Sequence, residues 1–219
     1  MFKFEFQFKG MTYNDKQVNI LEAAEKLFSE KGYDGTSVRD IAEAAGINIA
    51  MISYYFGSKE KLMQAIFESR TAQLTEKIEA LLANETLTPL EKLNVVVDDY
   101  VERIVSKERF YKLMICEQMM EKNVVINNLL FSLKKKNADL IARLLLDGQK
   151  KKVFKKNIDV VMLMNTMIGT VLQTFINKDY YKNFYNLTEM SEEEYKKMLF
   201  KKLTSHIKEL FKSLLSYEV

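Results

Sequence analysis

Hydrophobic residues recur every three to four positions along almost the whole of this chain. This spacing places apolar side chains on one face of an α-helix. It divides the chain from about residue 14 onward into about nine segments of helical length. The pattern therefore predicts an all-α protein of about nine helices.

The first ten residues follow a different period. Phe2, Phe4, Phe6 and Phe8 alternate with polar residues, which predicts a β-strand. A lone exposed strand of this kind needs a cover, because its unpaired backbone groups otherwise recruit other chains. Two interpretations stay open: the strand packs on a neighbouring segment or partner chain, or the true start is Met11.

Capping signals mark where several helices begin. Ser37 precedes Asp40 by the spacing of a capping box. The run Thr88-Pro89-Leu90-Glu91 combines a cap, a first-turn proline and an acidic third position. Asp147-Gly148 predicts a helix end. The predicted helices are 19–28, 37–45, 48–56, 58–82, 89–105, 108–121, 124–146, 157–177 and 191–216.

Residues 36–62 read TSVRDIAEAAGINIAMISYYFGSKEKL, two short helices joined by a tight turn and followed by the start of a long helix. Gly46 suits the left-handed residue of such a turn, and Asn48 suits the cap of the second helix. Ile52 and Phe56 lie four residues apart and can pack on the first helix, which leaves the opposite face outward. Two short helices around a glycine turn are the sequence form of a DNA-reading helix-turn-helix. The predicted DNA contacts are Ser37, Val38, Arg39, Asn48, Ile49, Ala50, Met51, Ser53, Tyr54, Tyr55 and Lys59, the last as a phosphate contact at a helix N-terminus.

This segment resembles the N-terminal domain of TetR/AcrR-type bacterial transcription regulators. The resemblance rests on Gly46-Ile47-Asn48, on Tyr54-Tyr55-Phe56-Gly57-Ser58-Lys59-Glu60-Lys61-Leu62, and on Gly32-Tyr33 with Thr36. It covers roughly residues 14 to 70. Ser53 departs from the pattern, since many members carry there a Tyr that touches backbone phosphates. The resemblance implies a DNA-binding domain over 14–60 and a helical ligand-binding and dimerisation domain over 61–219, after a leader of uncertain structure over 1–13.

Charge adds little to this picture. The formal net charge is +3, which is weak support for nucleic-acid binding. Residues 1–70 hold nine Lys and Arg against ten Asp and Glu, and the densest basic stretch is instead 134–156. We interpret that stretch as a solvated helix face and a helix C-terminus. Phosphate contacts must therefore come from a few placed groups and from backbone amides.

Two helices of the second domain predict a contact between chains. The segment 158–176 is apolar nearly all round, so its second face needs a cover. A membrane span is the alternative, but polar residues interrupt the segment and its flanks lack anchors. The helix 192–216 is the natural partner, and two such helices from each of two chains form the four-helix interface that the resemblance implies. The predicted interface residues are Met162, Gly169 (a close crossing point), Gln173, Tyr195, Leu199, His206 and Leu210.

The second domain is also rich in Met and aromatic residues, which suit either an ordinary core or an adaptable apolar pocket. The resemblance implies a small-molecule site, and the Met and aromatic content leads us to expect an apolar or amphipathic effector. The predicted lining is Phe110, Met114, Phe131, Met164 and Met167. The aromatic run Tyr180, Tyr181, Phe184 and Tyr185 is either a lid or a set of loop anchors.

Catalysis finds little support. His206 is the only histidine, no His/Cys/Asp cluster has metal-binding spacing, and no glycine-rich loop is present to cradle a nucleotide. The single Cys116 excludes an intramolecular disulfide and favours a buried structural thiol over a redox sensor. We therefore expect no enzyme activity, no metal and no cofactor.

We expect a cytoplasmic, homodimeric, ligand-responsive transcriptional repressor that binds a near-palindromic double-stranded operator, with no membrane partner. A ligand bound in the domain 61–219 would tilt the long helix 58–82, which links the two domains. The tilt would spoil the spacing of the two DNA-reading helices in the dimer. The alternative is a helical protein–protein interaction module without specific DNA binding. A salt-sensitive, sequence-preferring gel shift distinguishes the two.

Overall fold

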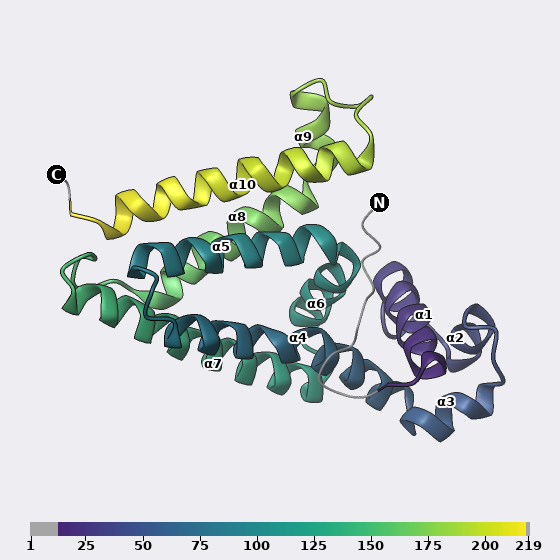
Figure 1. The fold of residues 1–219 in the computed structure, drawn as a ribbon. Coiled ribbons are helices and arrows are strands. Elements are labelled where there is room, and N and C mark those ends of the chain that lie inside the picture. The colour runs from purple at the N-terminus through teal and green to yellow at the C-terminus, as the bar shows by residue number, and fades with distance from the viewer. Residues whose placement is uncertain (1–12, 218–219) are drawn as a thin grey trace. The chain divides into compact units, whose positions relative to one another are not determined.

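The computed structural model describes residues 13–217, except for the side chains of residues 72–74. Over this range it is helical, without strands (Figure 1). The helices are α1 (Asp15–Lys31), α2 (Val38–Ala44), α3 (Ile49–Phe56), α4 (Lys59–Ala83), α5 (Pro89–Ser106), α6 (Glu108–Met120), α7 (Val124–Lys150), α8 (Val160–Ile176), α9 (Lys178–Phe184) and α10 (Glu192–Leu215). The all-α prediction is confirmed, and the strand predicted from Phe2 to Phe8 lies outside the described residues.

The described residues form ten helices rather than about nine. The additional helix is α9, which includes most of the aromatic run interpreted from the sequence as a lid or a set of loop anchors. Tyr180 contacts Phe184 and Tyr181 contacts Tyr185, with ring centroids 5.9 Å and 4.8 Å apart. Pairs four residues apart are neighbours on a helix surface, so these ring contacts stabilise a helix too short to be marked by apolar periodicity.

Most predicted starts are confirmed. Ser37, Thr88 and Ser191 each close a capping box, with Asp40, Glu91 and Glu194 as the third residues. The start predicted at Asn157 is wrong by two residues: Asn157 has a φ of 60°, outside helical geometry, and Asp159 caps α8 instead.

The helix end predicted at Asp147-Gly148 is also wrong, because α7 continues to Lys150. The absence of a side chain at Gly148 instead lets the ring of Phe154 approach the backbone of α7. A Cβ atom there would lie 2.1 Å from Cδ2 of Phe154, whose side chain is fully buried. The Gly148 carbonyl also accepts hydrogen bonds from the backbone N–H groups of Val153 and Phe154. The chain thus turns back directly after α7 and lays an aromatic ring on the glycine.

The helices form two compact units. Unit 1 comprises the chain up to Lys77 with Glu108–Lys134, and unit 2 comprises Ile78–Lys107 with the chain from Lys135 onward. Unit 1 therefore extends past the boundary predicted at residue 60 and includes α6, which packs against α1. The predicted division into domains stays a prediction.

Unit 1 is built around α1, which packs against α2 and α6. A buried ion pair adds to this packing: Nε of Arg70 on α4 lies 2.7 Å from Oε2 of Glu25 on α1. Both side chains are almost excluded from solvent, so the pair fixes the first part of α4 on α1. The fully buried apolar residues of the core include Ile20, Phe28, Ile41, Ile52, Ile66, Phe67 and Phe110.

In unit 2, α10 packs along α5 and also contacts α8 (Figure 1). Its inward residues recur at helical spacing and are buried: Tyr195, Leu199, Leu203, Ile207, Phe211 and Leu215. No single described helix is long and apolar enough to cross a membrane; α8 and α9 meet that criterion only as a pair, bent by 74° at their break.

The close approach at Gly148 yields a stability prediction. Gly148→Ala should lower the free energy of unfolding by about 1–3 kcal/mol despite alanine's better helix propensity, because a buried ring must move. Urea denaturation measures the loss. Phe154→Leu vacates space, so the same alanine should cost less in that background; equal costs in both backgrounds would contradict the contact.

Candidate nucleic-acid interface

The N-terminus of α2 is held by a reciprocal cap. The Ser37 hydroxyl accepts from the Asp40 N–H at 3.1 Å, and a carboxylate oxygen of Asp40 accepts from the Ser37 N–H at 2.9 Å. These hydrogen bonds lower the pKa of Asp40 below its ordinary value. Ser37 and Arg39 are exposed and Val38 is half-buried beside them, so the start of α2 presents a hydroxyl and a cation to solvent.

The turn between α2 and α3 has the geometry expected from its sequence. Gly46 has a φ of 63°, in the left-handed region that favours glycine. The Asn48 side-chain oxygen accepts from the Ala50 N–H at 2.9 Å and caps α3. The amide group of Asn19 on α1 donates to the Ala45 carbonyl at 2.7 Å. These residues lie far apart in the sequence, so no local sequence pattern predicts the contact.

The two faces of α3 differ in exposure. Ile52 and Phe56 are buried in unit 1. On the other face Tyr54 is 83% exposed and Ile49 47% exposed, Asn48, Ala50 and Ser53 are exposed, and Met51 and Tyr55 are half-buried. The rings of Tyr54 and Tyr55 meet edge to face, 5.0 Å apart. Large apolar side chains left in solvent on one helix face are typical of an interaction surface.

Lys59, the first residue of α4, has its ammonium group directed back into the protein. Its Nζ donates to the carbonyls of Tyr33 at 2.9 Å and Thr36 at 3.0 Å. It also lies 4.1 Å from the centroid of the Tyr33 ring. The phosphate contact predicted for Lys59 stays a prediction, although two of the three ammonium protons already have acceptors.

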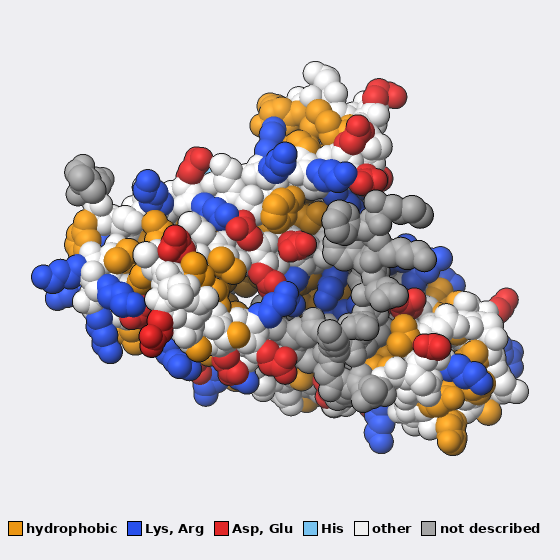
Figure 2. Space-filling model, in the orientation of Figure 1, with side chains coloured by type: hydrophobic (Ala, Val, Ile, Leu, Met, Phe, Trp, Pro, Cys, Tyr) orange, Lys and Arg blue, Asp and Glu red, His pale blue; other side chains and the backbone are white. Residues whose placement is uncertain are grey.

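Formal charge does not single out this surface. Lys and Arg side chains are interspersed with Asp and Glu over α1 to α3 on the face seen in Figure 2. A DNA contact here would rely on placed groups rather than on a broad positive field.

The residues predicted to line a pocket do not form one cluster. Phe110 is 2% exposed in the core of unit 1, and Met114 packs against that core. Phe131, on α7, is 69% exposed. Met164 and Met167 belong to unit 2, where they line a cavity.

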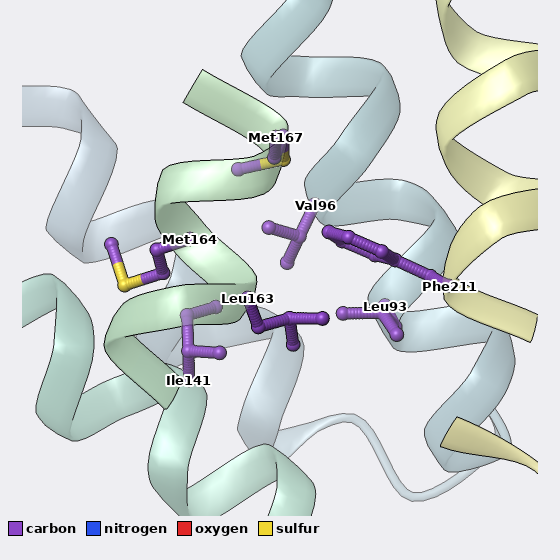
Figure 3. Close-up of a pocket in the computed structure, with 7 residues that line it drawn as sticks. All are labelled: Leu93, Val96, Ile141, Leu163, Met164, Met167 and Phe211. Atoms are coloured by element: carbon purple, nitrogen blue, oxygen red, sulfur yellow. The ribbon is translucent and has the colours of Figure 1, made fainter. Parts of the chain in front are cut away.

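This cavity lies among α5, α7, α8 and α10 (Figure 3). It holds about 10 Å³, roughly the space of one water-sized sphere. Met164 lies on the side of α8 away from Phe211 (Figure 3). A molecule larger than water could enter this cavity only if side chains moved. The lining is wholly apolar: Leu93, Val96, Ile141, Leu163, Met164, Met167 and Phe211.

Five of the seven predicted interface residues lie on the surface of unit 2. On α8, Met162 is 62% exposed, and Gly169 and Gln173 are exposed; on α10, His206 is exposed and Leu210 half-buried. The inclusion of Tyr195 and Leu199 was wrong. Each is 1% exposed, because it lies on the face of α10 that packs inside the protomer.

Cys116 is exposed on α6, contrary to the buried thiol that the sequence favoured. Leu113 and Glu117, its neighbours along the helix, take the buried positions instead. Among the described residues, no three His, Cys, Asp or Glu side chains are arranged to hold a metal ion.

Comparison with known proteins places this architecture in a family. The model for bacterial regulatory proteins of the tetR family matches residues 20–66. The model for a tetracyclin repressor-like C-terminal domain matches residues 89–201, more than half of the chain.

Three curated relatives are similar in sequence. The probable HTH-type transcriptional regulator YttP of Bacillus subtilis is 40% identical over 81 residues, 36% of this chain and 39% of that protein. The HTH-type transcriptional repressor NicS of Pseudomonas putida is 35% identical over 101 residues, covering 46% and 47%. The chain thus spans less than half the length of these two. The fatty acid metabolism regulator protein of Bacillus subtilis is 23% identical over 159 residues, covering 73% and 81%.

Solved structures share the fold over most of the chain. The ketosteroid transcriptional regulator KstR2 of Mycobacterium tuberculosis has a TM-score of 0.72 at 18% identity, covering 94% of this chain and 98% of that one. The transcriptional regulator FadR from Bacillus subtilis, in complex with stearoyl-CoA, has a TM-score of 0.60 at 23% identity, covering 86% and 97%. The two family models together match residues 20–66 and 89–201. This chain therefore belongs to the tetR family of bacterial regulatory proteins.

Proposed function

We propose that this protein is a transcriptional repressor that binds a near-palindromic operator as a homodimer and is released by a small molecule. The observation that carries the proposal is the outer face of α3. Ile49 and Tyr54 are left in solvent there, at the start and in the second half of α3. In a helix-turn-helix the second helix reads base edges in the major groove. The relatives are regulators rather than enzymes, and we place the protein in the cytoplasm with its DNA.

On the operator, α3 would lie in the major groove. Ile49, Ala50 and Met51 offer no side-chain hydrogen bonds and suit thymine methyl groups, while Asn48, Tyr54 and Tyr55 supply polar groups for base edges. Ser37, Arg39 and Ser53, with Val38 beside them, face the flanking phosphates. Residues 1–70 are nearly neutral in net charge, so we expect only modest affinity for non-specific DNA.

The exposed stripe on α8 supports a homodimer. Val161, Met162 and Ile176 are each about 60% exposed, and Gly169 and Gln173 lie between them on the same helix. Leu214 near the end of α10 and Tyr217 just beyond it are also apolar and exposed, at 49% and 52%. Because α8 and α10 contact each other inside the protomer, their outer faces together form one candidate interface. Two copies would place two α3 helices about 34 Å apart, one turn of DNA.

The position of α8 also suggests how an effector acts. Leu163 and Met167 line the cavity from one side of α8, whereas Met162 and Gly169 belong to its exposed stripe. A ligand that enlarges the cavity and shifts α8 would therefore also shift the proposed interface. Reversing a 1:99 balance between the two forms needs about 5.5 kcal/mol of differential affinity.

The proposal is tested by selecting duplexes from a random pool and measuring gel shifts with the selected sequence and a scrambled one. We expect a salt-sensitive shift that prefers the selected, near-palindromic sequence. The absence of any sequence preference would favour an interaction module instead.

Base reading should depend on particular side chains. Asn48→Ala and Tyr54→Ala should each lose about 1–3 kcal/mol, confined to particular base pairs. Asn48→Ser is the matched variant, because a hydroxyl retains the α3 cap but lacks the amide donor; it should show the same loss of discrimination without a loss of stability. A uniform loss across all sequences would mean that these residues hold only phosphates.

Assembly should depend on Gly169. A Cβ atom at this position meets nothing within 4 Å in the protomer, so Gly169→Leu should leave the fold of each protomer intact. If two α8 helices cross here, leucine should force them apart, and both dimerisation and operator binding should fall. Sedimentation measures the first and gel shift the second. A variant that stays dimeric and binds normally would remove Gly169 from the interface.

The wholly apolar lining predicts an effector with a large hydrocarbon part. Stearoyl-CoA, present in the FadR structure, is the probe, and coenzyme A without an acyl chain is its control. At 100 times its Kd a ligand stabilises the fold by about 2.7 kcal/mol, so stearoyl-CoA should raise Tm and abolish the gel shift while coenzyme A does neither. Met167→Phe should weaken the response by narrowing the cavity. Equal effects of both compounds would contradict an apolar site.

A further inference from the structure

We propose that Lys59 is a positioning residue that fastens the connection between α1 and α2 to the start of α4, rather than a contact to a DNA phosphate. The inference rests on the proposed DNA binding for its functional consequence. Its structural basis is the hydrogen-bonding environment of the Lys59 ammonium group.

The geometry satisfies most of the binding capacity of this group. Its two carbonyl acceptors, on Tyr33 and Thr36, lie at 2.9 and 3.0 Å and belong to residues more than twenty positions away. The Tyr33 ring lies 4.1 Å from Nζ, within the range of a cation–π interaction. These contacts hold the ammonium against the protein and leave it one further proton to donate.

Acidic groups act on the tyrosine whose ring holds this ammonium. Burial raises the pKa of Tyr33, and the carboxylates of Glu60, Asp34 and Glu117 raise it further. An environment of this sign suits a cation beside the Tyr33 ring.

Lys59 is the last link in a chain of contacts that begins in α1. The Thr36 side chain, 1% exposed, donates to the carbonyls of Leu27 at 3.2 Å and Gly32 at 2.8 Å. Lys59 then binds the Thr36 carbonyl. The end of α1 is therefore joined through Thr36 to the start of α4, the helix that follows the DNA-reading α3.

A second tie acts at the turn between α2 and α3, where Asn19 of α1 donates to the Ala45 carbonyl at 2.7 Å. The helix-turn-helix is thus fastened on either side of α2, by Lys59 at the connection before it and by Asn19 at the turn after it. Loss of either tie should let α2 and α3 shift relative to α1. Such a shift impairs recognition of one sequence more than general attraction to DNA.

The test compares Lys59→Met, which keeps the aliphatic stem, with Lys59→Gln, which restores one neutral donor. Specific and scrambled duplexes are titrated over a range of salt, and thermal unfolding is recorded without DNA. Hydrogen bonds to a charged group stabilise the fold, and each base contact that a displaced α3 loses is worth about tenfold or more in discrimination. We expect Lys59→Met to bind the selected operator about tenfold more weakly, with scrambled DNA and the salt slope unchanged and a lower Tm. Lys59→Gln should recover part of the specific affinity.

Two controls complete the design. Asn19→Ala removes the other tie without changing charge and should reproduce the selective loss. Arg39→Gln removes an exposed cation proposed to face phosphate, and should lower the salt slope by about one unit and weaken both duplexes. The inference is wrong if Lys59→Met and Lys59→Gln behave like Arg39→Gln, or if neither alters Tm. Failure of the wild-type protein to prefer any sequence would instead refute the proposed function. The change in Tm of the Lys59 variants would still test whether Lys59 fastens the connection between α1 and α2.

Discussion

The burial of Ile52 and Phe56 determines which face of α3 the protein presents to solvent. A helix of eight residues has too few hydrogen bonds to be stable alone, so its orientation comes from packing against the rest of unit 1. Once those two side chains are inside, the 3.6-residue period directs Tyr54 and its neighbours outward. The caps at Ser37 and Asn48 and the left-handed Gly46 then set where each short helix begins and how the chain turns between them. The side chains of the proposed DNA surface are thus those that remain exposed once the opposite face of α3 has packed into unit 1.

How much was predictable from sequence depended on how far apart the interacting residues lie. Capping boxes operate within three residues, and the sequence predicts those at Ser37 and Thr88 with their partners. The glycine at 148 was misread because its function depends on Phe154, whose ring folds back on it after the helix ends. Tyr195 and Leu199 were assigned to the wrong side of α10, since an amphipathic pattern identifies an apolar face but not what covers it. The polar contacts of Asn19, Glu25 and Lys59 span more than twenty residues, and no local signal could have revealed them.

The helix α8 illustrates why an almost uniformly apolar sequence is ambiguous. One side of it, with Leu163, Met167 and Val171, is buried inside unit 2, while the opposite side carries Met162 and Ile176 in solvent. Both sides look alike in sequence, because a surface that meets another protein has much the same composition as a core. The polar Gln173 and the bare backbone at Gly169 are the local features that distinguish them.

The ion pair between Glu25 and Arg70 limits how the N-terminal helices could be exchanged between this protein and its relatives. A head excised at residue 60 would carry Glu25 without its guanidinium partner, and removing one member of a buried pair costs about 3–5 kcal/mol. The packing of α6 on α1 adds a second dependence on a segment far along the chain. A transplantable DNA-binding module would therefore have to extend beyond Arg70 and bring a compatible α6 with it. The boundary at which function can be recombined thus lies beyond residue 60, where the sequence predicts the DNA-binding domain to end.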